Sequence, residues 1–287
     1  MAGENRFNSV TCLPMSDITS FLEQNFPLPG GFERFSPHEI HGLIYTPFDE
    51  ALSPLRLNKV LDANQLDQIK FFSDLMLFTR MLEECQPLKL TQKGNLPRKF
   101  CVDLYDSGIK DEDLIALKGH PINKEADSPY IFIIKLLARD LGLVKKRFGR
   151  MTLTQKGEKT LTDPISVNLF YDLFALYTQK YNWAYQDGYP ESWIIQAGFG
   201  FSIFLVQMYG SKSRSTDFYS DKFLNAFPKV MDNFEDTPYR TGKRVSQDAY
   251  SLRTFRRFLK RFSLIDMPGE QTLRKRALLD NLVEWRN

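Results

Sequence analysis

The sequence LVKKRFGRMTLTQKG, at residues 143–157, decides how this chain of 287 residues is expected to fold. Two short runs with recurring apolar residues, 143–146 and 151–154, flank Arg147-Phe148-Gly149-Arg150. Short runs joined by a Gly-containing loop are typical of a β-hairpin. We therefore predict two strands joined by a basic loop, or wing, in this stretch.

The pentapeptide Leu-Thr-Gln-Lys-Gly closes this stretch at Leu153–Gly157 and also occurs at Leu90–Gly94. Each copy follows an apolar segment with helical spacing, at residues 66–85 and 129–140. A recurring motif in a recurring context indicates a duplicated unit. We therefore predict that residues 63–163 form duplicated winged-helix-like units, each a helix packed on a short hairpin.

The remaining segments differ in character. Residues 1–62 are expected to be helical or irregular, and residues 164–245 to be an aromatic-rich helical domain. Residues 246–287 hold a basic helix and a hairpin pattern, which makes them a candidate third winged-helix-like unit. The predicted fold class is mainly α with short β-hairpins, built from tandem winged-helix-like units and a helical core domain.

The composition is that of a globular protein, with 43% hydrophobic and 14% aromatic residues. No apolar run approaches the roughly 18 residues of a membrane span, so no membrane partner is expected. The three cysteines are scattered, and no signal-peptide pattern is present at the start. These features predict a cytoplasmic protein without disulfides or a zinc site.

Charge is distributed unevenly, although the formal net charge is only +3. Residues 87–163 carry 15 Lys or Arg against 10 Asp or Glu, and residues 239–287 carry 12 against 5. Residues 1–86 have the opposite balance, 6 against 12. Such segregation is typical of a polyanion-binding surface, and solvated helix faces are the alternative explanation.

The sequence offers no catalytic constellation. His38-Glu39-Ile40-His41 is similar to a zinc-protease motif, but its histidines are three residues apart, not four. Ser36-Pro37 before it is a helix start, which explains the polar residues better. Phosphate-binding loops, dinucleotide fingerprints and nucleophile elbows are not recognisable. We expect a protein that is not an enzyme and needs no cofactor or metal.

Cations in the two basic regions are the candidates for nucleic-acid contacts, because Lys and Arg bind phosphates. In the predicted wing these are Lys145, Lys146, Arg147 and Arg150. Near the first pentapeptide, Lys89, Lys93, Arg98 and Lys99 are also available. In the last unit they are Arg253, Arg256, Arg257, Lys260, Arg274, Lys275 and Arg276.

The helices before the two pentapeptides are apolar almost all round, which is typical of buried helices and not of helices in a DNA groove. The helix after residue 246 is different, because Leu252, Phe255, Leu259 and Phe262 form one stripe and cations cover the other faces. We therefore expect residues 240–276 to be the main nucleic-acid-binding segment.

Several segments resemble a family of bacterial proteins described as plasmid ORF-3-like or transposon-passenger-like. The resemblance rests on residues 36–48, 88–97, 170–190 and 254–265 and on the second pentapeptide, and covers roughly residues 36–266. It implies a bacterial cytoplasmic protein in a mobile-element or host-defence neighbourhood. It brings no established activity and no catalytic residues.

Two hypotheses follow for function. The first is a non-enzymatic nucleic-acid-binding protein, with DNA as the expected partner and RNA as a variant, which uses basic winged-helix-like elements. The second is a protein-interaction scaffold or adaptor in a bacterial complex. The acidic first third and the aromatic segment 165–210 favour the second hypothesis.

Overall fold

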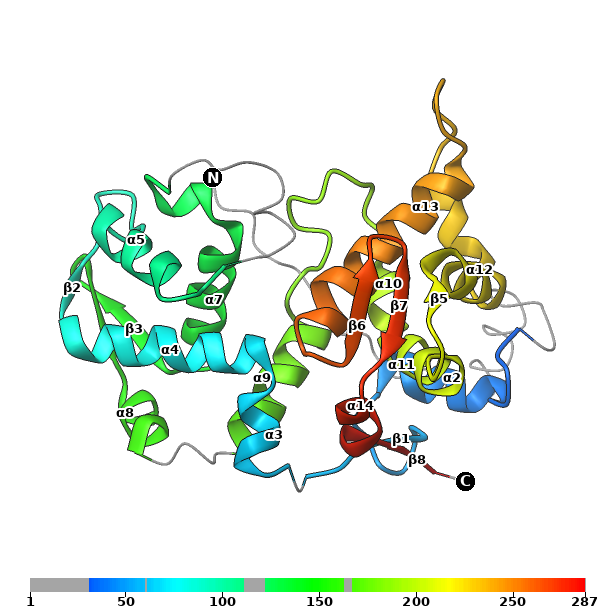
Figure 1. The fold of residues 1–287 in the computed structure, drawn as a ribbon, viewed down its shortest axis with the longest axis horizontal. Coiled ribbons are helices and arrows are strands. Elements are labelled where there is room, and N and C mark those ends of the chain that lie inside the picture. The colour runs from blue at the N-terminus through cyan, green and yellow to red at the C-terminus, as the bar shows by residue number, and fades with distance from the viewer. Residues whose placement is uncertain (1–30, 60, 111–121, 163–166, 287) are drawn as a thin grey trace. The chain divides into compact units, whose positions relative to one another are not determined.

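The computed structural model describes residues 31–59, 61–110, 122–162 and 167–286. It shows a mainly helical chain with small β-sheets (Figure 1). The prediction of a mainly α fold with short β-hairpins is therefore confirmed. Residues 1–30, which belong to the predicted N-terminal segment, lie outside the described residues.

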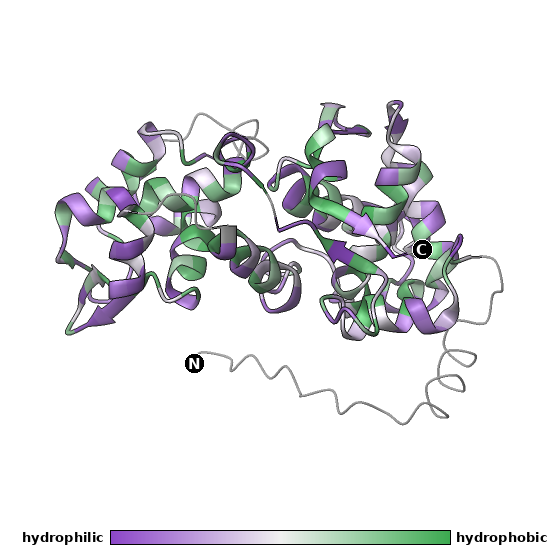
Figure 2. Cartoon of the chain, turned by 90° about the horizontal axis from the view of Figure 1, so that it is seen from below, coloured by the Kyte–Doolittle hydropathy of each residue, from purple (hydrophilic) through white to green (hydrophobic). Residues whose placement is uncertain are grey.

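Hydrophilic and hydrophobic residues are interspersed along the helices (Figure 2). The most apolar helix is α11 (Phe199–Tyr209), which has 11 residues. No helix among the described residues is long and apolar enough to cross a membrane.

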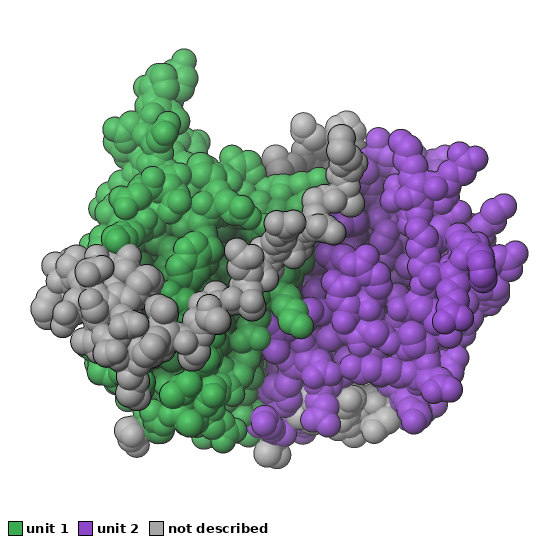
Figure 3. Space-filling view, turned by 180° about the vertical axis from the view of Figure 1, so that it is seen from behind, with its two compact units in different colours: residues 1–58, 178–260, 264–287 green, residues 59–177, 261–263 purple. Residues whose placement is uncertain are grey.

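The chain divides into two compact units (Figure 3). Unit 1 contains the described residues within 1–58 together with residues 178–260 and 264–287. Unit 2 contains residues 59–177 and 261–263, apart from those that are not described. This division differs from the four consecutive segments expected from sequence, because unit 1 gathers residues from both ends of the chain.

Unit 2 begins with the 5-residue helix α3 and the 16-residue helix α4, and it contains a three-stranded sheet. Its elements are α3 (Ala63–Asp67), α4 (Lys70–Cys85), β2 (Leu88–Lys89), α5 (Arg98–Asp106), η1 (Glu125–Asp127), α7 (Pro129–Asp140), β3 (Val144–Arg147), β4 (Arg150–Leu153), α8 (Gln155–Thr162) and most of α9 (Val167–Gln179). Ser128 caps α7 by accepting a hydrogen bond from the backbone N–H of Ile131, and Pro129 occupies its first position, as the sequence predicts.

The core of unit 2 is aromatic. Phe71 of α4 packs edge-on against Phe262, at 5.3 Å between ring centroids, and against Tyr177, at 5.2 Å. The predicted helix over residues 66–85 is divided between α3 and α4 at Gln68–Ile69. Ile69 is fully buried and has an extended backbone, so burying this side chain interrupts the helix there.

The two pentapeptides lie at the ends of two paired strands of a single sheet. Its strand order is β2-β4-β3, and β2 pairs antiparallel with β4 through Leu88↔Met151 and Lys89↔Arg150. The first copy follows β2, and the second begins with Leu153, the last residue of β4. The expected duplication within residues 63–163 is thus not formed, because the two-residue strand β2 finds its partner in the later hairpin and does not make one of its own.

The identical pentapeptides adopt different conformations. In the first copy, Gly94 has a φ of 79° and donates its N–H to the carbonyl of Thr91, which closes a turn. In the second, the hydroxyl of Thr154 accepts a hydrogen bond from the N–H of Gly157 at 3.1 Å, inside the first turn of α8. Context therefore decides the structure of this motif.

Unit 1 is also mainly helical. Its elements are α2 (Pro37–Tyr45), β1 (Leu55–Leu57), α10 (Trp193–Ala197), α11 (Phe199–Tyr209), β5 (Arg214–Ser215), α12 (Thr216–Ala226), η2 (Pro228–Asn233), α13 (Gly242–Tyr250), the π-helix η3 (Ser251–Lys260), β6 (Ile265–Gly269), β7 (Thr272–Lys275), α14 (Ala277–Leu282) and β8 (Val283–Trp285). Strand β1 pairs antiparallel with β8, so the first and last of the described strands lie side by side.

Local signals set several boundaries in unit 1. Ser36 and Glu39 form the predicted capping box at the start of α2. The predicted helix over residues 193–209 is divided at Gly198, where a Cβ would meet the ring of Phe223. Close packing against Phe223 therefore explains why a residue without a side chain stands here.

Apart from the short 3-10 helices η1 and η2, units 1 and 2 each contain a series of described elements in one order: helix, strand, helix, helix, strand, strand. In unit 2 these are α4, β2, α5, α7, β3 and β4, and in unit 1 they are α11, β5, α12, the α13–η3 segment, β6 and β7. The sheets also share one strand order, β2-β4-β3 and β5-β7-β6. The recurring pattern in unit 1 thus starts at Phe199, well before the expected third unit at residue 246.

Gly157 provides a test of the second pentapeptide's packing. Alanine is normally favoured over glycine in a helix by roughly 0.5–1 kcal/mol. At Gly157, however, an added Cβ would overlap the backbone carbonyl of Leu143. We expect Gly157→Ala to lower the free energy of unfolding by about 1–3 kcal/mol, measured by urea denaturation.

The control is Lys159→Ala, an exposed position in the same helix, which is expected to change stability by less than about 0.5 kcal/mol. A gain in stability for Gly157→Ala would contradict the close approach of α8 to Leu143.

Candidate nucleic-acid interface

Strands β3 and β4 form the predicted hairpin with a two-residue loop. Arg147 pairs with Arg150, so Phe148 and Gly149 make the turn. Both have positive φ values, 48° and 70°. Two central residues with positive φ are the mark of a type I′ turn, which matches the twist of the strands it joins. The hairpin predicted from sequence is therefore present, and its turn is tight.

The register sorts the residues of this hairpin onto two faces. Residues paired across antiparallel strands point to the same face. Val144 pairs with Leu153, and both are buried. Lys145 pairs with Thr152 on the opposite, outer face, and Arg147 pairs with Arg150 there.

Strand β2 extends the outer face. Lys89 pairs with Arg150, which in turn pairs with Arg147, so three cations lie side by side across three strands. With Lys145 they form what we call the basic sheet face: Lys89, Lys145, Arg147 and Arg150. All four side chains are exposed, and none forms an ion pair with any residue that the structure describes.

Like charges directly opposite each other in a sheet are destabilising. The central row Lys89–Arg150–Arg147 is such an arrangement, and an acidic partner would relieve its repulsion. The geometry therefore suits an extended anion that reaches all three strands.

Lys146, also predicted as a contact, belongs to the other face. It pairs with the buried Met151, and its Nζ lies against Gly94 in the turn of the first pentapeptide. Lys146 is exposed but points away from the row. It is therefore not part of the basic sheet face.

Helix α7 is buried, as its composition predicted. Ile131, Ile134, Leu137 and Ala138 are at most 1% exposed. Its two cations are paired: Lys135 with the buried Glu125, and Arg139 with Asp140. Glu125 also accepts a hydrogen bond from the backbone N–H of Leu96 at 2.6 Å. Helix α7 therefore presents no unpaired basic residue for a nucleic-acid groove.

In the segment expected to be the main nucleic-acid-binding site, residues 240–276, the structure shows that Arg253 is buried. Arg253 is 1% exposed, and its Nε donates to Oδ2 of Asp187 at 2.6 Å. Its Nη2 donates to the other carboxylate oxygen at 3.2 Å and to the carbonyl of Pro190 at 2.9 Å. The prediction that Arg253 contacts nucleic acid is wrong for this conformation, because its guanidinium is used inside unit 1.

The π-helix explains this correction. A π-helix has i→i+5 hydrogen bonds and more residues per turn than an α-helix. The residues that share one face of it therefore differ from those expected for an α-helix. Arg253 faces inward in η3, whereas Leu252, expected in the apolar stripe, is only half-buried. Phe255 and Leu259 are buried as expected.

The other predicted cations of this segment also have partners within unit 1. Arg256 donates to the carbonyl of Glu270, and Arg257 donates to the carbonyls of Trp183, Tyr185 and Gln186. Arg274 and Arg276 pair with Asp266, and Lys275 pairs with Asp280. Lys260 is half-buried. These contacts tie the cations of this segment to neighbouring groups of unit 1.

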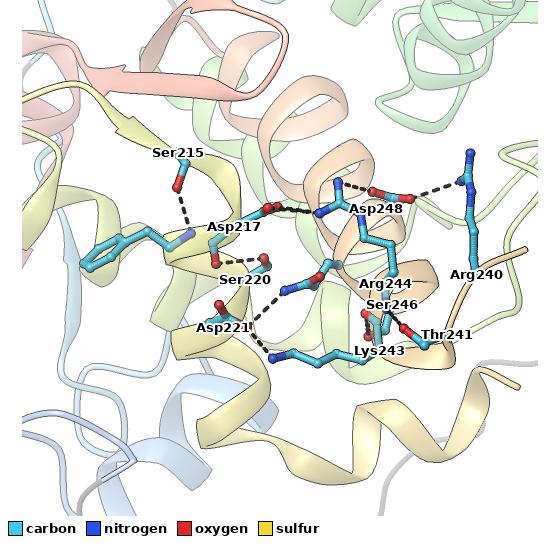
Figure 4. Close-up of polar contacts among 12 residues, drawn as sticks. Ser215, Asp217, Ser220, Asp221, Arg240, Thr241, Lys243, Arg244, Ser246 and Asp248 are labelled. Atoms are coloured by element: carbon cyan, nitrogen blue, oxygen red, sulfur yellow. Dashed lines mark hydrogen bonds and ion pairs between the residues drawn. The ribbon is translucent and has the colours of Figure 1, made fainter. Parts of the chain in front are cut away.

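Acidic residues of α12 neutralise the cations at the start of α13 (Figure 4). Arg244 pairs with Asp217 and Asp248, both at 2.9 Å, and Lys243 pairs with Asp221 at 2.9 Å. Burial lowers the pKa of Arg244, but its hydrogen bonds and the neighbouring carboxylates outweigh this effect and raise it. Three cations and three carboxylates thus balance here, since Arg240 also pairs with Asp248.

The sequence shows Lys89 as an available cation but does not reveal that it lies beside Arg150. The two residues are far apart in sequence, and β2 is too short to give a clear strand pattern. One sequence feature could have indicated that Lys89 and Arg150 are related: each lies shortly before a copy of the pentapeptide. Within the described part of the chain, no group of three or more His, Cys, Asp or Glu is placed to hold a metal ion.

Arg253 gives a test of this reassignment. Removing one partner of a buried ion pair leaves the other charge uncompensated and typically costs about 3–5 kcal/mol. We expect Arg253→Ala to lower the free energy of unfolding by about that amount in urea denaturation. Arg256→Ala, the control on the same helix, should cost about 1 kcal/mol or less, because Arg256 donates one exposed hydrogen bond. Equal, small effects of both variants would show that Arg253 is not a structural residue.

Comparisons with protein-family models, with curated proteins and with solved structures found no match for this chain, so the function of the basic sheet face is inferred from its own geometry.

Proposed function

We propose that this protein binds nucleic acid, and that the basic sheet face of unit 2 makes the phosphate contacts. The observation that carries the proposal is the row Lys89–Arg150–Arg147, exposed and unpaired within the described chain. A phosphate backbone is the extended anion that such a row fits, since Lys and Arg supply most contacts to phosphate oxygens.

We further infer that each unit is a winged-helix-like module. In such modules a helix-turn-helix is followed by a two-stranded wing, and the first short strand pairs with the last. The element order and the strand orders β2-β4-β3 and β5-β7-β6 support this inference. In unit 2, the β3–β4 hairpin takes the position of the wing.

The two modules are expected to differ in function. The hairpin β6–β7 of unit 1 has its cations paired with Asp266 and Asp280, whereas the basic sheet face of unit 2 has none paired with a described residue. We therefore assign binding to unit 2 and a structural role to the cations of unit 1.

The proposed binding tolerates many sequences. In helix-turn-helix proteins the recognition helix enters the major groove with polar side chains. Helix α7, in the equivalent position, buries Ile131, Ile134 and Leu137 and pairs both of its cations. Contacts from the sheet to phosphates set position without specifying bases. A mobile-element or host-defence setting, which the family resemblance implies, is compatible with such binding.

The test is a salt series of binding to labelled double-stranded DNA. Each phosphate contact that is lost reduces the slope of log K against log salt by about 0.9. The variant Lys89→Gln/Arg147→Gln/Arg150→Gln is expected to bind more weakly at low salt and to have a slope smaller by about 2–3.

The matched control removes three charges from the other hairpin, as Arg274→Gln/Lys275→Gln/Arg276→Gln. It changes the net charge equally, but its cations are already paired with carboxylates. Binding and slope close to wild type are expected for the control. Equal loss in both triple variants would show that net charge alone drives binding, and no binding by the wild-type protein at low salt would favour the scaffold hypothesis.

A further inference from the structure

The tip of the β3–β4 hairpin carries a large apolar side chain in full contact with solvent. Phe148 is 101% exposed. Among the described residues of unit 2, it is the one large hydrophobic side chain that is exposed; the others, Tyr185, Trp193, Met208 and Tyr239, belong to unit 1. Its ring therefore contributes no buried area to the fold.

The backbone at Phe148 is also unfavourable. Its φ of 48° lies in the left-handed region, where a bulky non-glycine residue is a genuine outlier. Asn-Gly and Asp-Gly are the pairs preferred in type I′ turns, and here Phe-Gly stands in their place. An exposed, strained aromatic residue that buries no area against the described chain motivates a functional explanation.

The charges around the ring indicate its partner. Arg147 and Arg150 pair directly below the turn, so Phe148 projects beyond two cations that point to the basic sheet face. A nucleic acid bound by those cations would bring its bases within reach of the tip. Nucleobases have flat π-faces that stack on aromatic side chains whatever their sequence.

We propose that Phe148 stacks on an exposed nucleobase, so that the preferred substrate is single-stranded nucleic acid or a duplex with an unpaired or easily unstacked base. This inference rests on the proposed function, because the phosphate contacts of the basic sheet face deliver the base to the ring. An anionic membrane is less well suited, since stable attachment to a bilayer takes more apolar anchoring than one side chain supplies.

Phe148→Asn separates the stacking contact from both folding and phosphate binding. Asparagine suits the type I′ turn better, so the urea midpoint is expected to rise. Affinity for a single-stranded oligonucleotide containing 2-aminopurine is expected to fall about tenfold or more, because stacking on an aromatic residue is lost. The salt slope should not change, since no cation is removed.

Phe148→Tyr is the matched control, because it keeps the ring, and it should retain wild-type affinity and the fluorescence change of 2-aminopurine on binding. A fully paired duplex and a duplex with one unpaired 2-aminopurine serve as further arms. Stronger binding of the single strand and the interrupted duplex than of the paired duplex, lost in Phe148→Asn, would support the proposal.

Unchanged affinity of Phe148→Asn for all three oligonucleotides, with a wild-type salt slope, would overturn stacking while leaving phosphate binding intact. Loss of binding to anionic phosphatidylserine vesicles but not to oligonucleotides would also overturn it and would assign the tip to lipid. A wild-type protein that binds no oligonucleotide at low salt would instead refute the proposed function itself.

Discussion

Pairing of β2 with β4 is the constraint on which the organisation of unit 2 depends. Two residue pairs, Leu88↔Met151 and Lys89↔Arg150, join a strand before α5 to a hairpin after α7. The backbone N–H of Leu90 adds a hydrogen bond of 2.8 Å to the carbonyl of Gly149, in the turn itself. The β2–β4 pairing brings together the two ends of the segment that contains α5 and α7. It also places Lys89 beside Arg150 and Arg147, so the fold of this segment and the arrangement of its charges have the same cause.

The two sheets show how similar topology can carry different electrostatics. In unit 1, carboxylates balance the cations of the β6–β7 hairpin and of α13, and the buried Asp187–Arg253 pair fixes the π-helix to the loop at residues 187–190. In unit 2, the outer face of the sheet keeps its cations exposed. The charge totals of the segments therefore identified the basic regions of the sequence. The ion pairs in the structure are needed to distinguish cations that stabilise the fold from cations that are exposed to a partner.

Sequence patterns predicted what local chemistry determines. The capping box of α2, the Ser128-Pro129 start of α7 and the β3–β4 hairpin all depend on neighbouring residues, and all three are found. Contacts between distant residues were not predictable in this way. The inward turn of Arg253 depends on a π-helix and on Asp187, 66 residues away, and the position of Lys89 depends on a two-residue strand without a clear period. The repeated pentapeptide indicated duplication, whereas the strands next to its two copies, β2 and β4, pair with each other in one sheet.

The most direct test of the central claim is photo-cross-linking of the wild-type protein to an oligonucleotide that carries photoreactive thymidine analogues, followed by peptide mass spectrometry. The account predicts adducts in peptides that contain residues 88–89 and 145–150, with Phe148 as the main cross-linked residue. Adducts confined to residues 240–276, or spread without preference over both units, would contradict the assignment of nucleic-acid binding to the basic sheet face.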